Sequence, residues 1–279
     1  MLPEGEPVRG VTSLGKELFV LREKACDQVE VYENFYYRPL RRLTVPNCRG
    51  LTDVTSCEHY CCVYIGDGGI ECIHRLDEHR AFTQWAVNDK PAGLSVNVAH
   101  NVLVTCPAVR KIKEFSSHGD LLRELTLDDD IINPSHAIQI RNDEIIVCYG
   151  SADDAVHRVC KIFCFSMGHT CSAGADVEMK TYSRYSHGGQ RGSGIGQYNM
   201  PRHLAVDNNE FVFVADFYNR RVTLLSPKLD YIRPVVSPDD LKWRPDRLCL
   251  DIELQRLYVA DNEWKDGKLT AGRVVVFSV

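Results

Sequence analysis

Four polar residues offer the clearest prospect of chemistry in this chain: Asp53, His136, His203 and Arg247. Each lies near the start of an apolar, strand-like segment, and the two histidines occur in similar phrases, PSHAIQI and PRHLAVD. Imidazole and carboxylate groups that converge can bind a transition metal or exchange protons. Whether these side chains meet depends on the elements that carry them.

The common catalytic motifs are absent from the sequence. It contains no Gly-x-Ser-x-Gly elbow, no His-Glu-x-x-His motif, no P-loop and no Cys-x-x-Cys pair. The segment CEHYCC at 57–62 is a weak metal candidate, because strand alternation would divide its ligands between two faces. We therefore predict no catalytic residue, no metal site and no cofactor, and we expect that the chain is not an enzyme.

Composition places the chain among ordinary globular proteins. Its net charge of −5 gives no general attraction to nucleic acid or acidic lipid, and no apolar run approaches the ~18 residues of a membrane-spanning helix. Most of the twelve cysteines lie inside apolar, strand-like segments, where a reduced thiol acts as a small hydrophobe. We expect a cytoplasmic protein with reduced core thiols and no membrane contact, with structural disulfides as the alternative.

A repeated phrase defines the elements that carry these residues. Six units of strand, turn and strand recur about every 40 to 44 residues, with one longer gap of about 66. Their anchor residues are Val11, Val54, Leu94, Ile138, Leu204 and Leu248. Period-two alternation and β-branched residues indicate strands throughout, and a third and a weaker fourth strand follow in most units.

Six such units predict an all-β, six-bladed β-propeller with four-stranded antiparallel blades. The last unit ends after its third strand, so its blade is either three-stranded or completed from the N-terminus. We expect residues 1–9 to be a tail or a closing edge strand, although Pro3 and Pro7 disfavour a strand there. Residues 10–279 form the single propeller, with a long loop near 166–200.

An aspartate that ends the second strand recurs with an arginine that begins the third. The pairs are Asp216 with Arg221, Asp261 with Arg273, and Asp67 with Arg75. A carboxylate in this place can accept backbone N–H bonds from the turn and hold the guanidinium of the arginine. We interpret these pairs as structural rather than catalytic.

The best-formed unit resembles an NHL repeat, the propeller repeat of the TRIM-NHL proteins. Its linker GSGIGQYNMP and the phrase VADFYNRRV match the family's Gly-rich linker, strand, aspartate and Asn-basic turn. The matching residues are Gly192, Gly194, Gly196, Gln197, Asn199, Pro201, Asp216, Asn219 and Arg221. The resemblance extends over Val11 to Val279, although the first four units are degenerate, and it implies the same six-bladed fold.

The resemblance also bears on function. NHL propellers often follow a RING and a B-box in ubiquitin ligases, but neither zinc module is present here, so we expect no ligase activity in this chain. Some six-bladed relatives, the peptidyl-hydroxyglycine amidating lyases, carry channel histidines on zinc. A third histidine equivalent to His136 and His203 is not evident, and we interpret Asp53, His136 and His203 as polar residues that solvate the mouth of a wet channel.

A second candidate site is the loop-rich face, where the loops after second and fourth strands emerge. Loops on a rigid scaffold commonly bind partners. The candidate binding residues are Phe217, Tyr218, Arg220, Trp243, Arg247, Trp264 and Lys265. Acidic loops such as Asp128 to Asp130 share this face, and acidic residues outnumber basic ones there, which disfavours phosphate binding.

These observations favour a non-catalytic scaffold that binds a protein or peptide partner on the loop-rich face. Binding of single-stranded RNA by the same face is the alternative, since aromatic and arginine side chains accompany one another there. A metal-dependent lyase or hydrolase in the channel is a more distant third.

Overall fold

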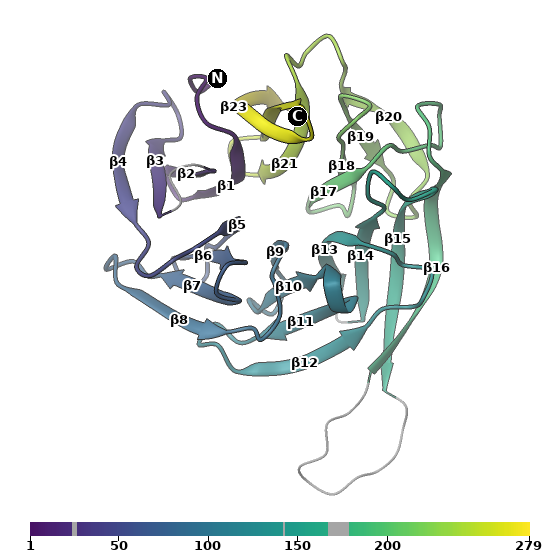
Figure 1. Ribbon diagram of the computed structural model, residues 1–279, viewed down its shortest axis with the longest axis horizontal. Coiled ribbons are helices and arrows are strands. Elements are labelled where there is room, and N and C mark those ends of the chain that lie inside the picture. The colour runs from purple at the N-terminus through teal and green to yellow at the C-terminus, as the bar shows by residue number, and fades with distance from the viewer. Residues whose placement is uncertain (24–26, 142, 167–178) are drawn as a thin grey trace, which may run out of the picture.

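The computed structural model describes residues 1–23, 27–141, 143–166 and 179–279. Figure 1 shows the chain arranged as blades around a central axis, with both termini between the first blade and the last. Blades 1 to 3 contain β1 (Val8–Leu14), β2 (Glu17–Arg22), β3 (Gln28–Glu33), β4 (Pro39–Thr44), β5 (Leu51–Cys57), β6 (Cys62–Asp67), β7 (Cys72–Leu76), β8 (Phe82–Ala86), β9 (Gly93–Val96), β10 (Val102–Cys106), the single-turn helix η1 (Pro107–Val109), β11 (Lys111–Phe115) and β12 (Leu121–Thr126).

Blades 4 to 6 contain β13 (Pro134–Arg141), β14 (Glu144–Tyr149), β15 (Val156–Ser166), β16 (Met179–Gln190), β17 (Pro201–Val206), β18 (Val212–Asp216), β19 (Arg221–Leu225), β20 (Tyr231–Val236), β21 (Arg244–Asp251), β22 (Arg256–Lys265) and β23 (Lys268–Ser278). The first five blades have four strands and the last has three. The predicted six-bladed propeller, with a three-stranded last blade, is confirmed.

The hydrophobic core explains why one phrase recurs six times. The described buried residues form six clusters, and each fills the space between two neighbouring blades. A blade buries both faces only if each neighbour presents a matching apolar face, so every unit needs the same alternation. The predicted anchor Ile138 is displaced by one residue. Ala137 occupies the position equivalent to Leu94 and Leu204, because all three pair with a valine of the second strand.

The segment predicted as a loop near 166–200 is largely a strand. Met179–Gln190 is β16, the outermost strand of blade 4, and it pairs with the whole of β15. Its first two residues also pair in parallel with β12, so that blades 3 and 4 share a continuous sheet. Residues 167–178 lie outside the described residues, and only the Gly-rich linker before β17 remains a loop.

The N-terminal segment joins the last blade to the first. Gly5 exchanges backbone hydrogen bonds with Gly272 of β23 at 3.0 and 2.9 Å, and the N–H of Leu2 donates to the carbonyl of Val274 at 2.9 Å. This contact is an isolated bridge rather than a fourth strand. The side chain of Leu2 is buried in the core cluster between blades 6 and 1, so these residues contribute to closure.

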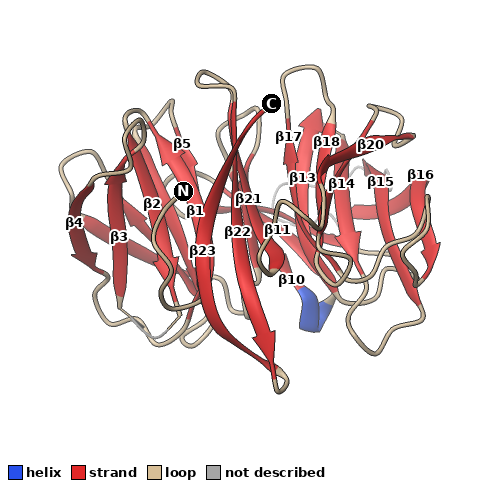
Figure 2. Ribbon diagram, turned by 90° about the horizontal axis from the view of Figure 1, so that it is seen from above, coloured by secondary structure: helices blue, strands red, loops and turns tan. Residues whose placement is uncertain are grey.

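The described chain contains no helix long and apolar enough to span a membrane. The two ends of the propeller differ in what they present. One end, the loop-rich face, carries the loops after second strands and between blades, and Figure 2 shows the β22–β23 hairpin extending beyond its neighbours there. The opposite end, which we call the turn face, carries the tight turns that join first to second and third to fourth strands.

Candidate functional site

The structure brings the four polar residues of the sequence prediction together at the loop-rich end of the channel. The equivalent position of the six innermost strands is occupied in order by Gly10, Asp53, Gly93, His136, His203 and Arg247. The rings of His136 and His203 stack with their centroids 3.7 Å apart. Asp53 lies 3.5 Å from Nε2 of His203 and 3.3 Å from Nε of Arg247. We call Asp53, His136, His203 and Arg247 the channel layer.

The channel layer satisfies backbone groups that no strand pairs. An innermost strand has no sheet partner on its channel side, so its N–H groups need other acceptors. Oδ2 of Asp53 accepts the N–H of Leu94 in the next blade at 2.8 Å. The two histidines do the same through Nδ1, for the N–H groups of Leu204 at 3.4 Å and Leu248 at 3.3 Å. Three members of the layer therefore join successive blades.

These contacts define the protonation of His136. Because its Nδ1 accepts a hydrogen bond, its proton is on Nε2, which donates to the carbonyl of Leu94 at 3.0 Å. Burial, together with the neighbouring His203, holds the pKa of His136 well below its usual value of 6.5. The imidazole of His136 is therefore neutral near pH 7, and it acts as a polar brace between blades.

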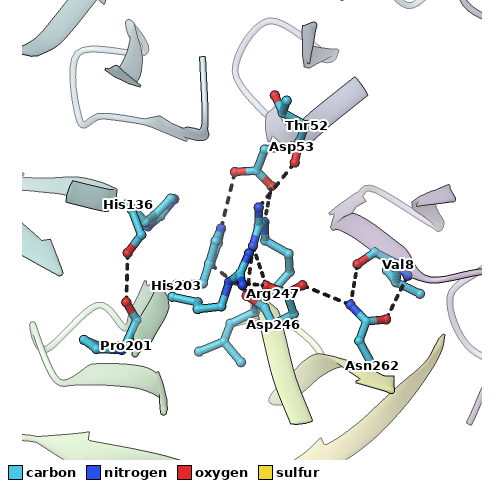
Figure 3. A network of polar contacts seen from close by, with 12 residues as sticks. Val8, Thr52, Asp53, His136, Pro201, His203, Asp246, Arg247 and Asn262 are labelled. Carbon is cyan, nitrogen blue, oxygen red and sulfur yellow. Dashed lines mark hydrogen bonds and ion pairs between the residues drawn. The ribbon is translucent and has the colours of Figure 1, made fainter. Parts of the chain in front are cut away.

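Arg247 links the layer to a chain of buried ionic contacts, which Figure 3 shows. Its Nη1 donates to Asp246 at 2.7 Å, and Asp246 also accepts Nε of Arg202 at 2.8 Å. Nδ2 of Asn262 donates to Asp246 at 3.1 Å. Asn262 in turn exchanges two hydrogen bonds, each of 2.8 Å, with the backbone of Val8 in β1.

The ionic chain closes the ring of blades. Arg247 belongs to blade 6 and Asp53 to blade 2, and the intervening blade 1 offers only Gly10 at that position. Burial acts to raise the pKa of Asp53, but His203 and Arg247 outweigh it and hold that pKa below its usual range. The carboxylate and the guanidinium are thus a charged pair that spans the junction between the ends of the chain.

The layer is buried on the loop-rich side, although His136 and His203 line the cavity beneath it. Asp53 and His136 are 1% exposed, His203 is 6% exposed and Arg247 is 8% exposed. Burial also removes Arg247 from the predicted contact residues of the loop-rich face. The physical reason is that the equivalent positions of the innermost strands meet near one axis, where the absence of a side chain at Gly93 leaves room for the ring of His136.

Below this layer the channel is a blind cavity of about 860 Å³ that opens on the turn face. Its walls are strand residues, mostly apolar, with hydroxyls such as Ser13, Thr55 and Ser95 among them. Its rim carries Phe35 and Tyr36, which are both exposed. The sequence did not indicate this cavity, because the turn residues that form its rim follow no common motif.

Two groups of potential metal ligands occur within the described residues: Asp53, His136 and His203 in the channel layer, and Asp67, Cys72 and His74 in blade 2. In the channel group each histidine already accepts a backbone N–H through Nδ1, and the guanidinium of Arg247 lies against the carboxylate. A cation there would displace an existing ion pair. The channel layer therefore stabilises the contacts between blades.

On the loop-rich face, an aromatic and cationic cluster lies over blades 5 and 6. Trp264 of the β22–β23 hairpin contacts the rings of Phe217 at 5.8 Å and Tyr218 at 6.4 Å, both edge to face. The guanidinium of Arg244 lies 5.2 Å above the Tyr218 ring and donates to the carbonyl of Trp264 at 2.9 Å. Trp264 and Tyr218 remain half-buried, and Lys265 beside them is exposed.

Two predicted contact residues have internal roles instead. Phe217 is fully buried beneath Tyr218 and Trp264, so it supports this surface and does not form part of it. The guanidinium of Arg220 donates to the carbonyls of Trp243, Pro238 and Leu241 at 2.7–3.0 Å, which fixes the loop between blades 5 and 6. The roles of Tyr218, Trp243, Trp264 and Lys265 in binding stay predictions.

The aspartate–arginine pairs have the structural geometry expected in blades 5 and 6. Arg221 donates through Nε to Asp216, and Arg273 does so to Asp261, each at 2.8 Å. The predicted pairing of Asp67 with Arg75 is wrong, because Arg75 lies opposite Tyr64 in the sheet register while Asp67 lies opposite Cys72.

Comparison with known proteins shows the fold but no family. No protein-family model and no curated protein matches the chain. Among solved structures, virginiamycin B lyase from Staphylococcus aureus is similar over 100% of this chain and 88% of its own, with a TM-score of 0.62 and 11% identity. Hydrazine synthase from Kuenenia stuttgartiensis matches over 100% and 96%, with a TM-score of 0.64 and 12% identity.

The Cps50 (Swd1) propeller domain of Myceliophteria thermophila is a third similar structure. The match covers 98% of this chain and 83% of that domain, with a TM-score of 0.58 and 8% identity. At these identities the likeness shows the shared propeller architecture, and a shared fold does not determine a shared function. The NHL resemblance stays an interpretation of the sequence.

Proposed function

We propose that the chain is a non-catalytic NHL-type scaffold that binds a segment of a protein partner at one patch on its loop-rich face. The patch consists of Tyr218, Trp243, Arg244, Trp264, Lys265 and Lys268, and we call it the blade 5–6 patch. The observation that carries the proposal is the cluster of half-buried aromatic rings with cationic neighbours on the most prominent hairpin of this face. Aromatic and arginine side chains of this kind dominate the binding energy of protein interfaces.

The charges of the patch favour a particular partner. Lys265 and Lys268 are exposed, as is Asp266 between them. Arg244 is held above Tyr218, so its cation is positioned in advance. We therefore propose a partner segment in which an acidic side chain lies next to an aromatic or aliphatic one.

The rigidity of the patch supports a binding role. Trp264 packs against blade 5 although it belongs to blade 6, and Arg220 anchors the adjoining loop with three hydrogen bonds. A surface that is ordered before binding loses less conformational entropy when the partner docks. None of the nine described cysteines is in a disulfide, and we propose a reducing, cytoplasmic environment for the chain.

RNA binding by this face has less support. Asp128, Asp129 and Asp130 lie together at blades 3 and 4 on the same face. Within the described residues, only Asp129 of the three has an arginine partner, Arg110 at 2.8 Å. Burial raises the pKa of Asp128, and the negative charges of Asp130 and Asp129 raise it further, because like charges repel one another. Such a cluster repels a phosphate backbone that would have to cross it. The lyase alternative also has less support, because Nδ1 of each channel histidine accepts a backbone N–H, Nε2 of His136 donates to a backbone carbonyl, and Arg247 lies against Asp53.

A peptide-display library panned on the whole chain tests the proposal. We expect a consensus that contains an acidic residue and an aromatic or aliphatic one, and we expect its retention to be lost on Trp264→Ala and Lys265→Glu. A consensus retained equally by both variants would place binding elsewhere. In parallel, a mixed single-stranded RNA pool should bind weakly and be released at physiological salt, whereas binding that survives would favour the RNA alternative.

A further inference from the structure

Blade 2 departs from the ionic pattern of blades 5 and 6 at one position. In blades 5 and 6 an aspartate of the second strand, Asp216 or Asp261, lies opposite an arginine in the sheet register. In blade 2 the same aspartate is Asp67, and its partner in the register is Cys72. The arginine is therefore replaced by a residue that carries no positive charge.

The carboxylate of Asp67 is fully buried, as are those of Asp216 and Asp261. Its Oδ1 accepts the N–H of Gly69 at 2.8 Å, and its Oδ2 accepts the N–H of Arg49 at 2.8 Å. Within the described part of the chain, no arginine or lysine lies within ion-pair distance of it, and its charged neighbour is at most His74, 3.5 Å away.

A buried carboxylate is costly unless a cation accompanies it. The side chain of His74 is fully buried, and its Nδ1 has no hydrogen-bond partner within the described residues. Neither the thiol of Cys72 nor the imidazole of His74 is a permanent cation. Asp67 therefore lacks the permanent counterion that the same position has in blades 5 and 6.

The three side chains are arranged as ligands of one small cation. Strand alternation places Cys72 and His74 on the same face of β7, opposite Asp67 at the end of β6. Sγ of Cys72 lies 3.4 Å from Nε2 of His74, which lies 3.5 Å from Oδ2 of Asp67. The donor atoms of all three lie within 4.8 Å of one another.

These spacings match tetrahedral zinc. Ligand bonds of about 2.0–2.3 Å in a tetrahedron place neighbouring ligand atoms roughly 3.3–3.6 Å apart, and sulfur, imidazole and carboxylate are the ligands that zinc takes in proteins.

We propose that Asp67, Cys72 and His74 form a three-ligand zinc site in blade 2. The zinc ion supplies the positive charge that Arg221 and Arg273 supply in blades 5 and 6. It also joins the second strand of the blade to the third. The channel group differs, because Arg247 already neutralises Asp53 there. This site is independent of the blade 5–6 patch.

Titration of the metal-stripped whole chain with Co²⁺ tests the proposal. We expect a thiolate-to-cobalt charge-transfer band and intense tetrahedral d–d bands that saturate at equimolar metal and disappear when Zn²⁺ is added. Cys72→Ala and His74→Ala should lose these bands. The matched control is Cys160→Ala, because Cys160 is an equally buried thiol in the core between blades 3 and 4, and it should keep them. Absence of the bands from the wild type, or their persistence in Cys72→Ala, would overturn the proposal.

A second variant separates metal binding from folding. Cys72→Arg restores the aspartate–arginine arrangement of blades 5 and 6. The thermal midpoint of the wild type should rise with Zn²⁺ concentration, whereas that of Cys72→Arg should not respond and should at least equal that of the stripped wild type. A stripped wild type that gains nothing from Zn²⁺ would contradict the site. If Cys72→Arg does not fold, the cobalt spectrum of the wild type still decides.

Discussion

At the scale of residues, the polar groups of the channel layer act where sheet hydrogen bonding ends. Asp53, His136 and His203 accept N–H groups from the next innermost strand, and Arg247 spans the position at which Gly10 offers no side chain. An unpaired buried N–H costs about 1–3 kcal/mol. The layer is therefore a stabilising device, and its residues should be tested first by stability.

Arg247→Met keeps the length of the side chain and removes its charge. Asp53 then loses its guanidinium and Asp246 keeps only Arg202, so we expect a loss of about 3–5 kcal/mol in the free energy of unfolding. Urea denaturation measures this change. The control is Arg42→Met, since Arg42 pairs with Glu30 at the surface, where an ion pair contributes about 1 kcal/mol or less. Equal effects of the two substitutions would contradict the role of the layer.

The neutral His136 predicts acid sensitivity. Its pKa is depressed by burial and by His203 and Arg247, which outweigh Asp53, whereas in the unfolded chain it returns to about 6.5. Below pH 6.5 the imidazole binds a proton in the unfolded state but stays neutral in the folded state. The free energy of unfolding therefore falls as the pH falls, by up to about 1.4 kcal/mol per pH unit. The slope of stability against pH below about 6.5 should decrease in His136→Gln. The exposed control His79→Gln should leave it unchanged, and an equal slope in both would refute the assignment.

The positions of these residues could be predicted from the sequence because the repeat gives each one an equivalent place in its blade. The alignment of units placed Asp53, His136, His203 and Arg247 at one end of the channel, and they do converge. It missed their burial, because the radius of a ring of side chains depends on all six positions, including both glycines. It also missed Cys72 and His74, although their i, i+2 spacing after Asp67 is a readable signal of a shared strand face.

At the scale of elements, the segment before β1 is the least regular connection. The sequence left open whether residues 1–9 are a tail or a closing strand, since prolines argue against a strand. The structure has backbone bonds from Leu2 and Gly5 to β23, and the guanidinium of Arg22 donates to the carbonyls of Glu6 and Gly272 at 2.8 and 3.1 Å. Long-range contacts of this kind are hard to predict from local pattern.

Leu2→Ala tests whether this segment closes the propeller. Leu2 is 1% exposed, so the truncation should destabilise the chain by about 2–5 kcal/mol, measured by urea denaturation. The control is Leu40→Ala in β4, because Leu40 is 48% exposed and should contribute little. If the two substitutions cost the same, residues 1–9 are a tail.

The second strand of the β15–β16 hairpin could not be predicted from the local sequence pattern. Its second strand, with the phrase SRYSHGGQ, is rich in Gly, Ser and Tyr, a composition typical of a loop. It forms a strand because eleven consecutive residues of β15 pair with it and β12 pairs with its start. Tertiary pairing overrides local propensity in strands more often than in helices.

At the scale of the whole molecule, the six-bladed fold followed directly from the repeat, because each of the six core clusters lies between consecutive units. The function did not follow in the same way. The loop-rich face could be located from the sequence. The burial of Phe217 and the internal bonds of Arg220 could not, because they depend on the packing of blade 6 against blade 5. What remains exposed is the blade 5–6 patch, with Trp264 at its centre.

The affinity of the consensus peptide for the whole chain, measured by isothermal titration calorimetry, tests this account most directly. We predict that Trp264→Ala weakens binding by about 2 kcal/mol or more, roughly 30-fold, as expected for an aromatic anchor at the centre of an interface. The control is Phe35→Ala, an exposed aromatic on the turn face, which should leave the affinity unchanged. An affinity that survives Trp264→Ala but falls with Phe35→Ala would contradict the account and assign binding to the channel cavity on the opposite face.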